Sequence, residues 1–330
     1  PHGKKTKSGW STNADVLEEL RPLHPVVDKV LRYRTVAKLK STYADGLLKA
    51  MDPDGRVRTS FQMTVTATGR LSSTEPNLQN IPTRTDLGSE IRRMFVPAEG
   101  CVLVDADYSQ IELRLLAHIS GDTAMQAAFT SGADIHTATA ARVFQMPVDM
   151  VTKDMRSKAK AVNFGIVYGI GAFSLSKDIG VTRKEADDYI KEYLRNYSGV
   201  DAYMKRVVEE AKRDGYVSTI FGRRRYLNDI ASRNAVARGL AERNAVNAPI
   251  QGSAADIMKI AMIRVSRRFR EEGIRSKVIL QVHDELVVDM LRSEQERVIA
   301  IVTEAMESAA ALRVRLVVDC GVGDNWLEAH

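Results

Sequence analysis

Cysteine is scarce in this sequence, since only Cys101 and Cys320 occur among its 330 residues. Two isolated cysteines form neither a disulfide framework nor the spacing of a zinc site, so we interpret both as small core residues. No stretch approaches the roughly 18 apolar residues of a membrane-spanning helix, and neither internal repeats nor low-complexity segments occur. These absences indicate an ordinary globular protein, for which we expect no membrane partner.

The composition is typical of a soluble chain, with 44% hydrophobic and 27% charged residues. A chain of 330 residues can form one large domain or a few subdomains. The net charge of +6 and the pI near 9.2 suit a polyanionic partner, although charge alone does not identify one. The sequence opens on a polar, basic stretch unlike a signal peptide, so we expect a cytoplasmic location.

Hydrophobic periodicity predicts strands on both sides of a long helical segment. Residues 13–48 show helical spacing with Pro22 and Pro25 between two helices, and mainly helical spacing fills 111–262. Strands are predicted at 57–68, at 101–106, as a pair within 277–290, and at 313–318 after a further helix. This order favours one sheet assembled from both ends of the chain, with a projecting helical subdomain and a binding cleft between them.

The first candidate site follows the apolar strand at 101–106, in the run Val-Asp-Ala-Asp-Tyr-Ser-Gln-Ile-Glu that ends at Glu112. A carboxylate at a strand end can be held rigidly while it faces a cleft, as a metal ligand requires. Alternation places Asp105 and Asp107 on the same face of the strand, so the pattern does not choose between them. A plain acidic turn explains this run about equally well.

The second candidate site lies in the predicted strand pair, where His283, Asp284 and Glu285 follow one another between apolar residues. Two carboxylates inside a buried hairpin would be costly to remove from water without a metal or a partner charge. A functional role is therefore favoured here.

The third candidate site is a helical stripe in which a charged or aromatic side chain recurs every four residues, namely Arg156, Lys160, Phe164 and Tyr168. Cations at one end and rings at the other suit a nucleoside triphosphate, because the cations neutralise phosphates and a ring packs against the base. An amphipathic helix with a solvated basic end is the commoner explanation for one such stripe taken alone.

Together these three segments resemble motifs A, B and C of family A DNA polymerases, the bacterial DNA polymerase I family. The resemblance extends over nearly the whole chain and includes Thr68-Gly-Arg-Leu-Ser-Ser-Thr-Glu-Pro-Asn-Leu-Gln-Asn-Ile-Pro82 and Asn247-Ala-Pro-Ile-Gln-Gly-Ser-Ala-Ala-Asp256. It implies an α+β right-hand polymerase fold with an antiparallel-sheet palm, helical fingers and a partial helical thumb. The implied boundaries are 1–60 for the thumb, 61–113 and 251–330 for the palm, and 114–250 for the fingers. No room is then expected for a proofreading or 5′-nuclease domain.

The resemblance also implies a reaction, the template-directed addition of deoxynucleotides to a primer 3′-hydroxyl with release of pyrophosphate. In the family the motif A aspartate directly precedes Tyr-Ser-Gln, which selects Asp107 over Asp105 and leaves Asp105 without an assigned role. Asp107, Asp284 and the backbone carbonyl of Tyr108 would bind two Mg²⁺ ions, for which Mn²⁺ can substitute. Glu285 would act as an accessory acid.

For the incoming deoxynucleoside triphosphate, the resemblance assigns the phosphates to Arg156, Lys160 and His136, with Lys160 as a proton donor to the leaving group. Phe164 would flank the nucleotide, and Tyr168 would occupy the template-base position until the fingers close. Glu112 would crowd the place of a ribose 2′-hydroxyl, which favours deoxynucleotides, and Gln110 belongs to the same site. Phenylalanine at 164 predicts discrimination against dideoxynucleotides.

For the primer-template duplex, the resemblance implies contacts that tolerate every sequence. Arg70, Gln251 and His283 match residues that read the minor-groove acceptors near the primer end, since these acceptors are shared among base pairs. Further positions match residues that bind the DNA backbone, namely Lys38, Ser41, Thr42, Asn77, Asn80 and Arg84. The chain is expected to act as a monomer.

Three alternatives compete with this interpretation. A single-subunit RNA polymerase shares a related palm, but Glu112 argues against it. A DNA-binding module without catalysis would not require the paired carboxylates Asp107 and Asp284. An unrelated metal-dependent nuclease would need such carboxylates, yet it would not explain the stripe from Arg156 to Tyr168.

Overall fold

The computed structural model describes residues 5–7, 9–82 and 86–330, which form two compact units. The first unit comprises Pro1–Gln62 and Ser72–Phe95, and the second comprises Met63–Leu71 and Val96–His330. In the described part of the chain, no helix combines the length and the apolar character needed to cross a membrane.

The first unit is mainly helical. Two helices separate at Pro22 and Pro25, as predicted, because His24 adopts an extended conformation and caps the second helix, which begins with Pro25. Its elements in order are β1 (Lys5–Thr6), β2 (Gly9–Trp10), α1 (Ala14–Leu20), a 3₁₀ turn (Arg21–Leu23), α2 (Pro25–Lys38), a π-helical segment (Leu39–Ala44), α3 (Asp45–Ala50), β3 (Ser60–Gln62), β4 (Ser72–Thr74), α4 (Asp86–Ser89) and a 3₁₀ turn (Glu90–Met94).

The strand predicted at 57–68 is largely wrong. Only Ser60–Gln62 forms a strand, which pairs antiparallel with Ser72–Thr74. The residues between them form turns and belong to the second unit, and Gly69 adopts a φ of +81°, which is a left-handed turn conformation.

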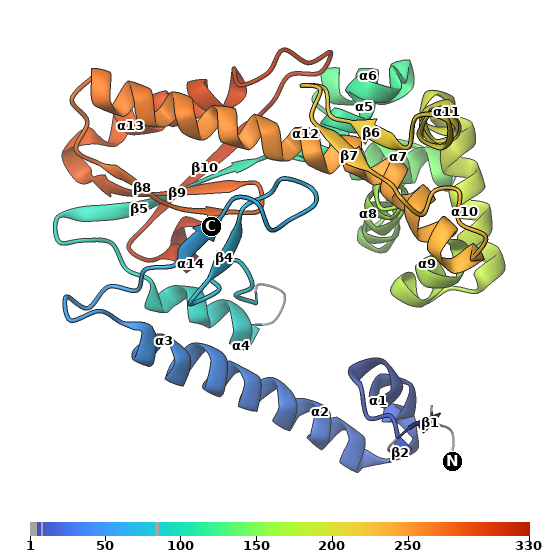
Figure 1. The fold of residues 1–330 in the computed structure, drawn as a ribbon, viewed down its shortest axis with the longest axis horizontal. Helices are drawn as coiled ribbons and strands as arrows, with labels where there is room; N and C mark the ends of the chain where they lie inside the picture. The colour runs from blue at the N-terminus through green and yellow to red at the C-terminus, as the bar shows by residue number, and fades with distance from the viewer. Residues whose placement is uncertain (1–4, 8, 83–85) are drawn as a thin grey trace. The chain divides into compact units, whose positions relative to one another are not determined.

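The second unit contains an antiparallel sheet in the order β10-β5-β9-β8. Its strands are β5 (Cys101–Tyr108), β8 (Lys277–Val282), β9 (Glu285–Leu291) and β10 (Val318–Gly323). The sheet therefore joins residues from both sides of a long helical segment, as predicted (Figure 1).

The last strand begins at Val318, so the prediction of a strand at 313–318 is wrong. The preceding segment is bonded elsewhere, because the backbone N of Arg313 donates to His118 and the backbone O of Val317 accepts from Ser109. These bonds remove the backbone groups that a strand ladder would use.

The remaining elements of the second unit are mostly helices, with one short hairpin, β6 and β7, that the periodicity did not indicate. They are α5 (Ile111–Ser120), α6 (Thr123–Thr130), α7 (Ile135–Val143), a 3₁₀ turn (Val148–Met150), α8 (Lys153–Val167), α9 (Ala172–Ile179), α10 (Arg183–Asn196), α11 (Ser198–Asp214), β6 (Tyr216–Ser218), β7 (Arg224–Tyr226), α12 (Ala235–Glu271), a 3₁₀ turn (Arg292–Glu294), α13 (Gln295–Glu307) and α14 (Trp326–Ala329). The helix α12 runs from the helical region to the sheet (Figure 1).

The two faces of the sheet differ in chemistry. On β5, Val102, Val104 and Ala106 point into the main core, which also contains buried residues of α12 and α13. The alternate residues Asp105 and Asp107 therefore point to the other face, where α14 packs on β5 and β10 (Figure 1). This alternation brings acidic side chains together on one side of a rigid sheet.

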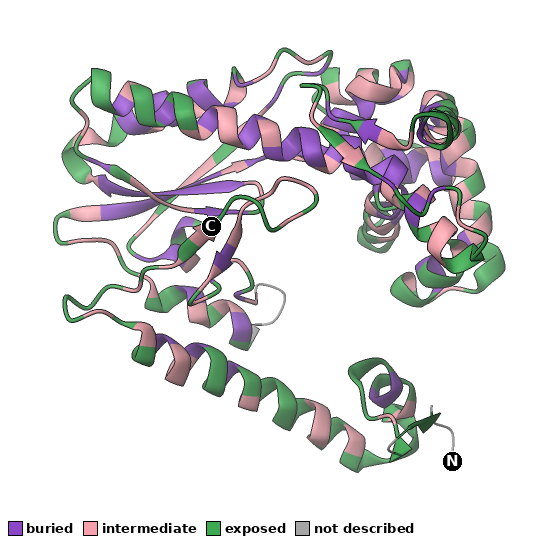
Figure 2. Cartoon of the chain, viewed as in Figure 1, coloured by how far each residue is buried: buried purple, intermediate pink, exposed green. Residues whose placement is uncertain are grey.

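Burial also distinguishes the two units. In Figure 2 the central strands β5 and β9 and the middle of α12 are largely buried, whereas α2 in the first unit contains no buried residue. Stability of the second unit should therefore depend on the core between the sheet and α12 and α13.

We expect Leu286→Ala to lower the free energy of unfolding of the second unit by roughly 2–5 kcal/mol, because Leu286 is fully buried in this core. Urea denaturation followed by circular dichroism measures the change. Val236→Ala on α12 is the matched control, since Val236 is 80% exposed and its truncation should cost less than about 0.5 kcal/mol. Equal effects of both substitutions would contradict this assignment of the core.

Candidate active site

The carboxylates of the first two candidate segments lie together on the sheet. Asp107 on β5 stands opposite Glu285 on β9 in the antiparallel register, and Asp284 precedes Glu285 in the turn between β8 and β9. The backbone N of Tyr108 donates to the backbone O of Asp284 at 3.1 Å, which fixes this turn against the end of β5. Strand pairing thus places residues that are far apart in the sequence in one cluster.

The turn itself has an unusual backbone conformation. His283 adopts a φ of +47°, in the left-handed region that non-glycine residues rarely occupy but that tight hairpin turns require. The His283 side chain is exposed, whereas Asp284 is only partly exposed. The turn therefore directs Asp284 toward the cluster and His283 toward solvent.

The carboxylates of this cluster perturb one another strongly. Burial, followed by the charges of Asp284, Glu285 and Asp105, raises the pKa of Asp107 to about 7. Burial likewise raises the pKa of Asp284, although Arg70 opposes that shift. A divalent cation with oxygen ligands would relieve this repulsion, so the donor set fits Mg²⁺ or Mn²⁺.

Asp105 lies on the same face as Asp107, as alternation predicted, but it has a different partner. Its Oδ2 lies 3.0 Å from Nδ1 of His330, and Oε2 of Glu285 lies 3.1 Å from the same nitrogen. Asp105 and Glu285 are both buried. The sequence did not indicate His330, because it is separated from Asp105 by most of the chain.

A second network joins the carboxylates to the third candidate segment. Arg70 Nη2 donates to Glu112 Oε1 at 2.7 Å and to Asp284 Oδ1 at 3.3 Å. Tyr168 hydrogen-bonds with Glu112 and Gln251, and burial raises its pKa to about 12. Burial also raises the pKa of Glu112. The structure therefore joins five predicted site residues by one continuous set of contacts, namely Asp284, Arg70, Glu112, Tyr168 and Gln251.

The loop that carries Arg70 is fixed by Arg223, which sequence reasoning missed. Arg223 Nη2 donates to the backbone O of Thr68 at 2.7 Å and of Gly252 at 2.9 Å, while its Nε donates to Asp256 Oδ1 at 2.9 Å. A Cβ at Gly252 would lie 3.0 Å from this guanidinium, so glycine makes the contact possible. Nothing in the local sequence distinguishes Arg223, because its partners are distant in the chain.

The predicted stripe lies on the exposed side of α8. Arg156 and Lys160 are exposed, while the alternate side of the helix, including Val162 and Ile166, is buried. Arg156 forms a bidentate pair with Asp134 through Nε at 3.0 Å and Nη2 at 2.8 Å. Asp134 was not predicted, because nothing in its local sequence distinguishes it from an ordinary helix cap.

The aromatic end of the stripe is supported from behind by a buried histidine. His136 is almost fully buried, its ring centroid is 5.7 Å from that of Phe164, and burial lowers its pKa to about 4. Asn163 Nδ2 lies 3.1 Å from His136 Nδ1, whereas His136 Nε2 has no hydrogen-bond partner among the described residues. One ring nitrogen of the neutral imidazole is thus buried without a partner among the described residues. Lys160 Nζ lies 6.0 Å from the Phe164 ring on α8.

Gln110 occupies the junction between β5 and α5. Its φ of +56° starts α5 in a left-handed conformation, and its side-chain oxygen is buried without a hydrogen-bond partner in the part of the chain that the structure describes. An unsatisfied buried acceptor is costly, so this position is suited to a ligand that supplies a donor.

The predicted backbone-binding residues lie in the first unit. Lys38, Ser41 and Thr42 are exposed where α2 passes into the π-helical segment, and Asn77 and Asn80 are exposed on a nearby loop. The Tyr43 hydroxyl donates to the backbone O of Asn80 and so joins these two segments. Arg84 lies outside the described residues.

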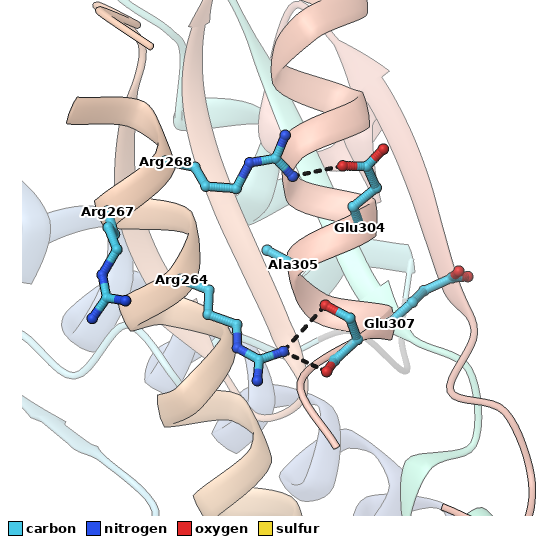
Figure 3. A pocket seen from close by; sticks show the side chains of 7 residues that line it. Arg264, Arg267, Arg268, Glu304, Ala305 and Glu307 are labelled. Carbon is cyan, nitrogen blue, oxygen red and sulfur yellow. Dashed lines mark hydrogen bonds and ion pairs between the residues drawn. The ribbon is translucent and has the colours of Figure 1, made fainter. Parts of the chain in front are cut away.

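A pocket elsewhere on the second unit contains none of the predicted residues. It lies between α12 and α13 and is lined by Arg264, Arg267, Arg268, Glu304, Ala305, Glu307 and Ser308 (Figure 3). Arg268 pairs with Glu304, and Arg264 donates to the backbone O and side chain of Ser308. Since Arg264 and Arg268 already have partners, the pocket is a weaker candidate than the carboxylate cluster.

Comparisons with known proteins agree with one another. The family model described as DNA polymerase family A matches residues 1–328. DNA polymerase I of Caldicellulosiruptor bescii is 53% identical over 326 residues, which cover 98% of this chain and 38% of that protein. DNA polymerase I of Geobacillus stearothermophilus is 53% identical over 328 residues, which cover 99% of this chain and 37% of that protein. The chain thus spans less than two fifths of these curated relatives.

A solved structure is similar over the whole chain. It is described as the POL domain of Pol1 from M. smegmatis in complex with DNA primer-template and dNTP, and it matches with a TM-score of 0.95 and 46% identity. The match covers 100% of this chain and 58% of that one. The α+β fold is therefore that of a DNA polymerase I POL domain.

The raised pKa of Asp107 predicts a pH-dependent effect on stability. In the folded chain this carboxyl holds its proton up to about pH 7, whereas its ordinary value is 3.8, so ionising it above that range destabilises the fold. In EDTA we expect Asp107→Asn to raise the free energy of unfolding at pH 8 by up to about 4 kcal/mol and to have no effect near pH 3. Denaturant titrations across this pH range measure the difference. Asp188→Asn, at an exposed position on α10, is the control, and a pH-independent difference for Asp107→Asn would refute the prediction.

Proposed function

This chain belongs to DNA polymerase family A, and from that premise we propose that it is a template-directed DNA polymerase. It adds deoxynucleoside monophosphates to a primer 3′-hydroxyl and releases pyrophosphate. The observation that carries the proposal is the cluster of Asp107, Asp284 and Glu285, whose mutual repulsion calls for a divalent cation. The contacts from Asp284 through Arg70 and Glu112 to Tyr168 connect this cluster with the stripe on α8.

The proposed hand assigns each part of the fold a task. The palm is 61–113 with 251–330 and includes the sheet that carries the carboxylates, the fingers are 114–250 and include α8, and the partial thumb is 1–60. The similarity to a POL domain supports this division, because that structure matches the whole chain with a TM-score of 0.95.

Asp107, Asp284 and the backbone carbonyl of Tyr108 are the proposed ligands of two Mg²⁺ ions, with Mn²⁺ as a substitute. When bound, such ions lower the pKa of a primer hydroxyl and neutralise charge on the triphosphate and pyrophosphate. The protein must then hold these carboxylates in a fixed arrangement. The β5–β9 register and the bond from Tyr108 N to Asp284 O supply that rigidity, and Glu285 adds negative charge beside them.

Arg156, Lys160 and His136 are the proposed phosphate-binding residues. Arg156 would exchange the Asp134 carboxylate for a phosphate group, because each of these groups offers two acceptor oxygens to its guanidinium. His136 Nε2 faces no partner among the described residues and is therefore available as a donor. Lys160 would donate a proton to the leaving pyrophosphate.

The nucleoside part of the substrate is assigned to the aromatic end of the stripe. Phe164 would flank the incoming nucleotide, and Tyr168 would hold the place of the template base until the fingers close. Glu112 would exclude a ribose 2′-hydroxyl, and its bond with Arg70 keeps its carboxylate in place. Gln110, whose side-chain oxygen lacks a donor, belongs to the same site.

A DNA primer-template duplex is the proposed macromolecular partner, bound by one chain acting as a monomer. The related POL domain is described in complex with such a duplex and a dNTP. Arg70, Gln251 and His283 would contact the minor groove near the primer end. The DNA backbone would be bound by the residues Lys38, Ser41, Thr42, Asn77, Asn80 and Arg84.

Primer extension with Mg²⁺ and all four deoxynucleotides tests the proposed reaction. Asp107→Asn and Asp284→Asn should each reduce the rate by about 10³-fold or more, because each removes several kcal/mol of transition-state charge stabilisation. Asp105→Asn is the matched variant on the same strand face and should lose far less activity at saturating Mg²⁺, because Asp105 is not a proposed metal ligand. Wild-type chain that binds primer-template without extending it would refute the polymerase assignment, and dependence on Asp105 equal to that on Asp107 would refute the choice of ligands.

Phe164→Tyr should reduce discrimination against dideoxynucleotides. Its added hydroxyl would replace the missing 3′-hydroxyl as a hydrogen-bond donor to the charged triphosphate, a bond worth roughly 1.5–3 kcal/mol, or about 10–100-fold in relative incorporation. Single-nucleotide incorporation with matched dNTP and ddNTP gives the ratio of kcat/KM for each enzyme. Phe173→Tyr, at an exposed position on α9, is the control, and an unchanged ratio for Phe164→Tyr would place residue 164 away from the sugar.

A further inference from the structure

His330 lies between two buried carboxylates on the acidic face of the sheet. Its Nδ1 is 3.0 Å from Asp105 Oδ2 and 3.1 Å from Glu285 Oε2, so a single Nδ1–H can donate to both. Asp105 is 3% exposed and Glu285 is 4% exposed, whereas the His330 side chain is 40% exposed. The imidazole thus covers the two carboxylates from the solvent side.

The strand register explains why the imidazole reaches both carboxylates. Asp107 is opposite Glu285, and Asp105 is opposite Val287, so Asp105 and Glu285 are diagonal neighbours on adjacent strands. Their ligand atoms and that of His330 all lie within 4.8 Å of one another. Without a donor between them, the two carboxylates would repel each other and turn apart.

The position of His330 is set by rigid elements on both sides. It follows α14, which is held by Trp326 at 0% exposure and capped by Asn325. The backbone of this helix lies so close to β10 that a Cβ at Gly323 would lie 2.6 Å from Ala329 N. Because α14 is anchored by these contacts, it should stay in place when the exposed imidazole is removed.

We propose that His330 is a positioning residue for the reaction, with Asp105 as its orienting partner. By bridging Asp105 and Glu285 it fixes the carboxylate of Glu285, which follows Asp284 in the chain and faces Asp107 across the strands. Asp105 acquires a role in this arrangement, since a carboxylate that accepts from an imidazole fixes the orientation of the ring. The inference rests on the proposed function, because it concerns the arrangement of the same cation-binding carboxylates.

Mn²⁺ titration of the purified chain, followed by electron paramagnetic resonance without DNA or nucleotide, tests this role. His330→Ala should bind Mn²⁺ about 10-fold more weakly, which is the usual effect of removing a group that orients metal ligands. His330→Asn should restore most of the affinity, because its amide nitrogen can occupy the position of Nδ1 and donate in its place. His330→Ala should then need about 10-fold more Mn²⁺ for half-maximal primer extension than the wild-type chain. Its affinity for primer-template in EDTA should be unchanged.

Two further variants separate the possible failures. His118→Ala removes another partly exposed imidazole, one that accepts from the backbone of Arg313, and should leave Mn²⁺ affinity unchanged. Asp107→Asn should abolish high-affinity binding. If Asp107→Asn weakens binding but His330→Ala does not, or if His330→Asn is as impaired as His330→Ala, the positioning role is overturned. If even Asp107→Asn binds Mn²⁺ normally, the proposed function fails and this inference with it.

Discussion

The antiparallel pairing of β5 with β9 is the contact on which the candidate active site depends. It sets Asp107 opposite Glu285, and it ends at the turn that presents Asp284. Side chains alternate between the two faces of a strand, so the same pairing that buries Val104 and Val288 in the core places the acids together on the other face. A shift of β9 by one residue would turn Glu285 toward the apolar core and would turn Leu286 and Val288 toward the acidic face.

Such a cluster is unfavourable in isolation, and the surrounding structure shows how the fold sustains it. Arg70 contacts Asp284 and Glu112 from one side, and His330 contacts Asp105 and Glu285 from the other. Arg223 holds the loop that carries Arg70 against α12. The cluster therefore receives side-chain donors from two distant parts of the sequence, Arg70 and His330. What remains uncompensated is centred on Asp107, whose pKa stays raised to about 7.

Sequence reasoning succeeded where local pattern determines structure and failed where distant contacts do. The apolar run at β5 and the strand pair around Asp284 were recognised because burial leaves a clear hydrophobic signal. Alternation placed Asp105 and Asp107 on one face but could not separate them, because the difference is the contact of Asp105 with His330. The strand predicted at 57–68 was wrong because β-compatible residues there form turns, and the one predicted at 313–318 was wrong because its backbone bonds to α5 and to the end of β5. Asp134 and Arg223 carry no local signal and follow only from the packed structure.

The two arginines that face the proposed substrates differ in how firmly they are held. In the pair of Arg156 with Asp134 the side chains are 45% and 42% exposed, so solvent screens the interaction and it contributes roughly 0–1 kcal/mol. In the pair of Arg70 with Glu112 they are 24% and 4% exposed, and removing one partner there would leave a buried charge without compensation. A triphosphate bound as proposed would therefore displace Asp134 readily, because it carries more negative charge than the Asp134 carboxylate. In the proposed complex Arg70 would keep Glu112 while it contacts DNA. Of its two carboxylate partners it would then release Asp284, which lies at the longer distance of 3.3 Å. Once Arg70 released Asp284, the Asp284 carboxylate would be free to bind a cation. Binding of DNA at the primer end would in this way promote assembly of the proposed metal site.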